Sequence, residues 1–124
     1  MSKNKRDRDR ATEAFRRWAR AGCPELDKIR DGRGAEDLRA CVAVFAALEE
    51  KRAERYRTNF PAFEIMEAVR AIYMAYPRRQ PRRGEIALRV IRFGREMFAD
   101  ERTVYRWLST ARRMWAEFRD KTCQ

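Results

Sequence analysis

The segment DERTVYRWLSTARRMWAEF, residues 100–118, carries the sharpest pattern in the sequence. Its apolar residues recur at steps of three and four, the spacing of one face of an α-helix. The apolar stripe consists of Val104, Leu108, Ala111, Trp115 and Phe118. The polar stripe consists of Arg102, Arg106, Ser109 and Arg113, with Tyr105 and Arg112 on its flanks. This pattern predicts an amphipathic helix over residues 101–120 that packs through one face and is capped by Asp100.

The rest of the chain also shows helical spacing between loops marked by Gly and Pro. The pattern predicts helices at 11–21, 35–57, 61–76 and 85–94. The inner face of the third of these is expected to hold Phe63, Met66, Val69, Ile72, Tyr73 and Tyr76. The sequence contains no strand candidate longer than four residues and no internal repeat. We therefore expect an all-α fold of about five helices.

Charge divides the chain into three parts. Residues 1–20 carry eight basic and three acidic side chains, residues 21–76 carry nine and ten, and residues 77–124 carry thirteen and six, which sums to a net charge of +11. We expect a flexible basic arm at 1–10, a helical scaffold at 11–76 and a basic region at 77–124, within one compact domain. Arg outnumbers Lys by 25 to five, which fits phosphate or guanine recognition and equally fits a GC-rich genome.

Composition removes several classes of protein. The longest uncharged apolar run has nine residues, at 40–48, whereas a membrane span needs about 20. The chain begins without an apolar signal region, so we expect a cytoplasmic protein with no membrane partner. It contains no histidine, and its three cysteines, Cys23, Cys41 and Cys123, form no metal-binding motif. We therefore predict no catalytic site, no metal, no cofactor and no enzymatic activity, and we expect Cys41 to be a core residue.

A short basic connector precedes the last two predicted helices. It reads PRRQPRRG, residues 77–84, and contains Arg78, Arg79, Arg82 and Arg83. Prolines favour an extended backbone that would hold these arginines toward solvent. The connector is interpreted as a source of nonspecific phosphate contacts, and the alternative is a solvated link between two helices.

The segment from Asp100 to Leu108 resembles the recognition helix of helix-turn-helix proteins. It is similar in particular to the region-4-like module of sigma factors and of phage late-gene transcription regulators, over roughly residues 82–118. The resemblance places Glu101, Arg102, Thr103 and Arg106 at the positions that face DNA, and Val104 and Leu108 at the inward positions. The turn expected here, Gly94 to Ala99, is longer than the three or four residues usual for the motif.

The leading hypothesis is a sequence-specific double-stranded DNA-binding protein, a phage or mobile-element transcription regulator that inserts helix 101–120 into the major groove. Arg102, Thr103 and Arg106 would contact base edges or the nearest phosphates, and Arg112 and Arg113 would contact the backbone. The arm at 1–10 would follow the backbone or enter a minor groove. Trp107 is expected to pack, with stacking on a base as the alternative.

Other functions remain open from sequence. An amphipathic helix with arginines on its wet side is common in helical proteins of any function. A small helical inhibitor or adaptor that binds a protein or ribonucleoprotein, as anti-CRISPR proteins do, would have a similar composition. General RNA binding is a third alternative, although the chain shows no RNA-module signature. A homodimer is compatible with the sequence, through residues 49–57 or 107–118.

Overall fold

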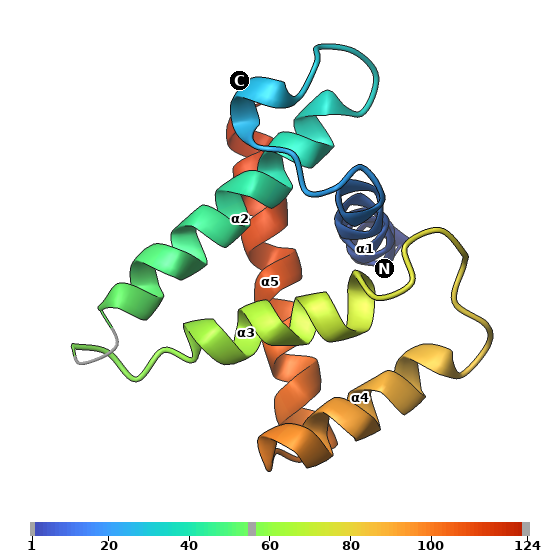
Figure 1. Cartoon of the computed structure of the whole chain (residues 1–124), viewed down its shortest axis with the longest axis vertical. Helices are drawn as coiled ribbons and strands as arrows, with labels where there is room; N and C mark the ends of the chain where they lie inside the picture. The colour runs from blue at the N-terminus through green and yellow to red at the C-terminus, as the bar shows by residue number, and fades with distance from the viewer. Residues whose placement is uncertain (1, 55–56, 123–124) are drawn as a thin grey trace.

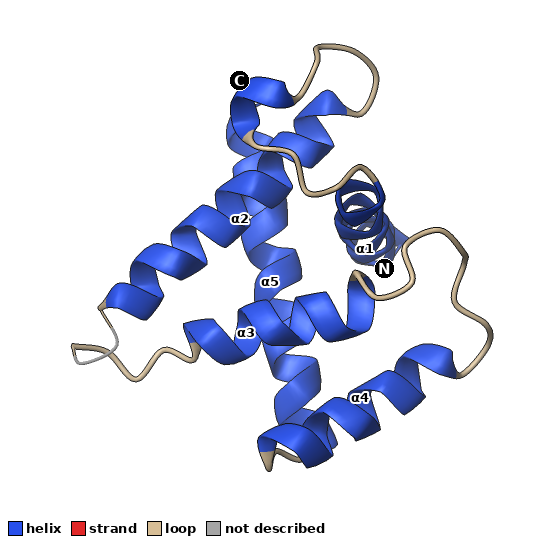
Figure 2. Ribbon diagram, viewed as in Figure 1, coloured by secondary structure: helices blue, strands red, loops and turns tan. Residues whose placement is uncertain are grey.

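The computed structural model describes residues 2–54 and 57–122, and the side chains of residues 10–54 and 57–121. This part of the chain is helical and contains no strand, which confirms the all-α fold (Figure 2). The elements are α1 (Ser2–Arg20), a short 3₁₀ turn η1 (Leu26–Lys28), α2 (Ala35–Ala53), α3 (Ala62–Ala68), the π-helical turn η2 (Val69–Tyr73), α4 (Glu85–Met97) and α5 (Glu101–Thr122).

Helix α5 lies at the centre of the fold. It runs along the long axis of the molecule, with α2 and α3 crossing in front of it in Figure 1 and α4 at its beginning. Helices α1, α2, α3 and α4 all contact it. The predicted apolar stripe forms this contact, since Val104, Leu108, Ala111 and Trp115 are buried. The pattern that predicted the helix therefore also predicted its core face.

Helix α1 begins earlier than expected. We predicted a flexible arm at 1–10 and a helix that starts near residue 11, whereas the backbone is helical from Ser2. Arg and Lys are good helix formers, so a helix anchored by its buried residues Phe15 and Trp18 extends through the basic segment. The expected arm is thus corrected to the first turns of α1.

A buried carboxylate ties three helices together. Asp37 of α2 accepts hydrogen bonds from Arg10 of α1, with Nη2 to Oδ1 at 3.1 Å, and from Arg119 of α5, with Nε to Oδ1 at 2.6 Å. The backbone carbonyl of Asp37 accepts from Trp115 Nε1 at 3.0 Å. Burial of a charge is tolerated only when the charge is paired, as it is here. Asp37 therefore fixes α1 and α5 against the start of α2.

The predicted helix at 61–76 ends early, at Tyr73. Helix α3 ends at Ala68, and the wider turn η2 continues only to Tyr73. Tyr76 has a φ of 51° and precedes Pro77, and a residue before proline is disfavoured in the helical conformation. The chain leaves the helix there, so Tyr76 is 67% exposed instead of joining the inner face. Phe63, the other error in that face, is also exposed.

Helix α4 runs to Met97, and the turn to α5 is only Phe98, Ala99 and Asp100. The expected longer turn, Gly94 to Ala99, is therefore wrong. Gly94 lies within α4, and the Ala99 backbone folds back onto it, with the Ala99 N–H donating to the Gly94 carbonyl at 2.8 Å. Because Gly94 has no Cβ, the Ala99 carbonyl oxygen can approach it closely. Phe98, with a φ of 54°, ends the helix in a left-handed conformation typical of helix C-termini.

Candidate nucleic-acid interface

The basic stripe of α5 is exposed along the helix. Arg102, Arg106, Ser109 and Arg113 are all exposed, on the face opposite the buried stripe. Among the described side chains, no ion pair involves these three arginines, whereas Arg10, Arg79 and Arg119 are each paired with a carboxylate. Unpaired guanidinium groups are free to bind phosphate or guanine edges in a bidentate manner. The structure thus brings together three predicted arginines on one open face.

The start of α5 is capped as predicted. The Thr103 backbone N–H donates to Asp100 Oδ1 at 2.8 Å, and Thr103 itself is half-buried. This bond and the Thr103 hydroxyl lower the pKa of Asp100, and the nearby Arg102 and Arg106 lower it further. The capped helix presents Arg102 and Arg106 within its first two turns.

Arg112 lies apart from this stripe, although sequence analysis assigned it to the DNA backbone. It is partly buried, and its Nη1 donates to the hydroxyl of Tyr73 in η2. Its position four residues after Leu108 places it on the edge of the core face. Trp107 is also half-buried, with its ring perpendicular to that of Phe93 at 6.2 Å, so it packs against α4 as expected.

The basic connector between η2 and α4 holds two kinds of arginine. Arg78, Arg82 and Arg83 are exposed, and no ion pair among the described side chains includes them. Arg79 is different because its two terminal nitrogens donate to the two oxygens of Glu85, at 2.8 and 3.0 Å. We therefore regard Arg79 as part of the connector's framework, and the other three arginines as its available charges.

The carboxylate of Glu85, at the first position of α4, accepts several hydrogen bonds. It also accepts from the Arg82 backbone N–H at 3.1 Å and from Arg89 Nη2. The bonds from Arg79, Arg82 and Arg89, with Arg79 contributing most, lower the pKa of Glu85 from its usual 4.5 to about 2. Sequence analysis missed this cluster, although a Glu three residues after Arg82 and four before Arg89 is a recognisable signal.

The connector and the beginning of α5 lie at opposite ends of α4 (Figure 1). A helix of 13 residues is about 20 Å long, whereas the major groove of DNA is about 12 Å wide. The arginines of the connector and those at the beginning of α5 are therefore separated by about the length of α4.

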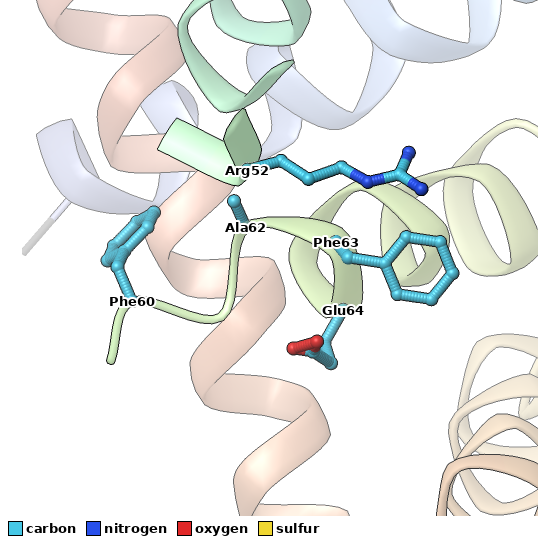
Figure 3. Close-up of a pocket in the computed structure, with 5 residues that line it drawn as sticks. All are labelled: Arg52, Phe60, Ala62, Phe63 and Glu64. Carbon is cyan, nitrogen blue, oxygen red and sulfur yellow. The ribbon is translucent and has the colours of Figure 1, made fainter. Parts of the chain in front are cut away.

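A separate hollow lies where α2 approaches α3, away from the arginine stripe. It has a volume of about 260 Å³ and is lined by Arg52, Phe60, Ala62, Phe63 and Glu64. In Figure 3 the Arg52 side chain extends toward Phe63, and its Cζ lies 4.8 Å from the centre of that ring. Phe60 and Phe63 point in different directions, so the hollow does not form an enclosed apolar pocket.

Two other kinds of site are absent from the described residues. No group of three or more His, Cys, Asp or Glu side chains among them is placed to hold a metal ion. None of the helices in the described ranges is both long and apolar enough to span a membrane.

Comparison of the chain with protein-family models, with curated proteins and with solved structures finds no match.

Proposed function

We propose that this chain is a sequence-specific double-stranded DNA-binding protein, and that α5 reads the major groove. The observation that carries the proposal is the open face of α5, where Arg102, Arg106 and Arg113 stand exposed without ion-pair partners in the described part of the chain. Arg102 and Arg106 would contact base edges, and Arg113 the phosphates beside them. In this proposal, the protein acts as a phage or mobile-element transcription regulator.

The turn between α4 and α5 adds support. Phe98, Ala99 and Asp100 make a three-residue turn, which is the length typical of a helix-turn-helix motif. The half-buried Thr103 lies at the edge of the exposed arginine stripe of α5, and its backbone N–H is held by the Asp100 cap. Arg78, Arg82 and Arg83 would contribute nonspecific affinity from the other end of α4.

The test starts with selection of a preferred site from random 30-base-pair duplexes, followed by fluorescence anisotropy across a salt series. Each phosphate contact steepens the fall of log affinity with log salt by about 0.9. We expect Arg102→Ala with Arg106→Ala to abolish discrimination between the selected and random sites. A matched control is Arg30→Ala with Arg33→Ala, which removes two exposed arginines from the η1–α2 loop.

The proposal is wrong if the wild-type chain binds no duplex at low salt while its circular dichroism shows a folded helical protein. It is also wrong in its assignment of α5 if the Arg102/Arg106 variant keeps full discrimination. A weak general loss of affinity in the control, with discrimination intact, is the expected effect of removing charge alone.

A second function has a specific observation in its favour. Phe98 is 98% exposed and Leu88 is 56% exposed, and such large apolar side chains on a surface often mark protein contacts. Phe98 also lines a hollow of about 480 Å³ with Ile91, Arg95 and Glu101. A helical inhibitor or adaptor that docks on a protein or ribonucleoprotein would use this surface. Phe98→Ser would abolish binding to such a partner and leave duplex affinity nearly unchanged.

A further inference from the structure

The connector 77–84 is held at both of its ends by one cluster of side chains. Arg89 of α4 donates from Nη1 to the Ile72 carbonyl of η2 at 2.7 Å, and from Nη2 to Glu85. Glu85 also binds the guanidinium group of Arg79 inside the connector. The chain of contacts from Ile72 through Arg89 and Glu85 to Arg79 therefore bridges the segment that enters the connector and the helix that leaves it.

Two more contacts tighten this cluster. The Glu85 backbone N–H donates to the Arg82 carbonyl at 3.0 Å, while the Arg82 N–H donates to the Glu85 side chain at 3.1 Å. The Tyr76 ring lies 5.1 Å from Cζ of Arg79 and 5.6 Å from Cζ of Arg89. Both guanidinium groups that bind Glu85 thus also contact the exposed aromatic ring at which the connector begins.

Resting on the proposed function, we infer that Glu85 is a positioning residue that shapes the connector for phosphate binding. Arg79 is bonded to Glu85, and the Arg82 backbone is held by hydrogen bonds to the same residue. The guanidinium groups of Arg78, Arg82 and Arg83 are exposed and available for phosphate. A segment that is already ordered avoids much of the entropy cost of binding, since each long side chain that becomes fixed weakens association.

The expected effect of Glu85→Gln on DNA binding is opposite to the effect of net charge alone. Glu85→Gln raises the net charge from +11 to +12, and added positive charge alone strengthens binding to DNA. If Glu85 positions the connector, the same change weakens binding, because Arg79 is released and the connector must be ordered by the ligand. We expect affinity for a random 30-base-pair duplex to fall about two- to tenfold, the range for ordering one long side chain on binding.

The matched control is Glu96→Gln. Glu96 is exposed on the same helix, and no ion pair in the described part of the chain includes it. It gives the same change in net charge, and none of the hydrogen bonds of the cluster involves it. Affinity is measured by anisotropy at one salt concentration and at a temperature where circular dichroism shows both variants folded. Weaker binding by Glu85→Gln with equal or stronger binding by Glu96→Gln supports the inference, and stronger binding by both overturns it.

A second measurement does not depend on DNA. Trypsin cleaves after arginine, and an ordered connector resists it, so the rate of cleavage after Arg78 and Arg79 reports the order of this segment. We expect Glu85→Gln to be cut there faster than Glu96→Gln and wild type, as followed by mass spectrometry. Equal rates overturn the positioning role. A wild type that binds no duplex overturns the proposed function, and the trypsin rates still decide whether Glu85 orders the connector.

Discussion

Replacing Gly94 by Ala is expected to destabilise the protein, although Ala is the better helix former. A Cβ built on Gly94 would lie 2.6 Å from the Ala99 carbonyl oxygen and 3.5 Å from Val104 Cγ2. The first contact is too short for a real Cβ, and its partner is backbone, which cannot rotate away. Such overpacking costs about 3 kcal/mol at the upper part of its usual range. The gain in helix propensity is about 1 kcal/mol. The net loss in the free energy of unfolding is therefore about 2 kcal/mol.

Urea unfolding followed by circular dichroism measures this loss. Ala87→Gly is the matched variant, because Ala87 is exposed in the same helix and reports the propensity difference without a clash. We expect Ala87→Gly to cost about 1 kcal/mol, and Gly94→Ala to cost more in spite of its opposite chemistry. If Gly94→Ala instead stabilises the protein by the amount that Ala87→Gly loses, the close turn between α4 and α5 is refuted.

Two further predictions concern titratable groups. The pKa of Glu85 is lowered to about 2, so its contribution to stability is complete above its usual pKa of 4.5 and is lost as pH falls toward 2. Wild type should therefore lose more stability than Glu85→Gln between pH 6 and pH 2.5 in urea titrations, and parallel losses would contradict this. Burial raises the pKa of the Cys41 thiol far above its usual value, whereas Cys23 is exposed. Iodoacetamide should modify Cys23 in the native chain and reach Cys41 only after unfolding, as peptide mass spectrometry would show.

Periodicity predicted the helices because burial follows it closely in this chain. The stripe from Val104 to Trp115 was predicted and is buried, and Cys41 lies in the core as expected. The predictions were wrong at positions where the backbone conformation departs from the helical spacing of apolar residues. Tyr76 continues the helical spacing but precedes a proline, and Gly94 looks like a helix end but is a point of close backbone approach. Neither effect is visible in hydrophobic spacing alone.

The candidate site was predictable in part for a related reason. Exposure of Arg102, Arg106 and Arg113 follows from their angle on the helix, which the sequence specifies once the core face is known. Pairing between distant segments does not follow from it. Arg112 binds a tyrosine 39 residues away, and Arg79 is taken up by Glu85. From the sequence, each arginine is expected to be available for binding a ligand. In the folded protein, some arginines are already bonded to other side chains of the chain.

Helix α5 packs at the centre of the fold through one side and carries the exposed arginines on the other. The conformation of the arginine face is therefore coupled to the folding of the whole protein. This face cannot fray, swing or order by itself, since Leu108 and Trp115 on its reverse side hold the other helices together. Any ligand that binds there stabilises the whole cooperative unit, and its apparent affinity falls with the folded fraction. Heating should therefore abolish binding and helical structure at the same temperature. No folded state in which the arginine face of α5 is lost should be populated.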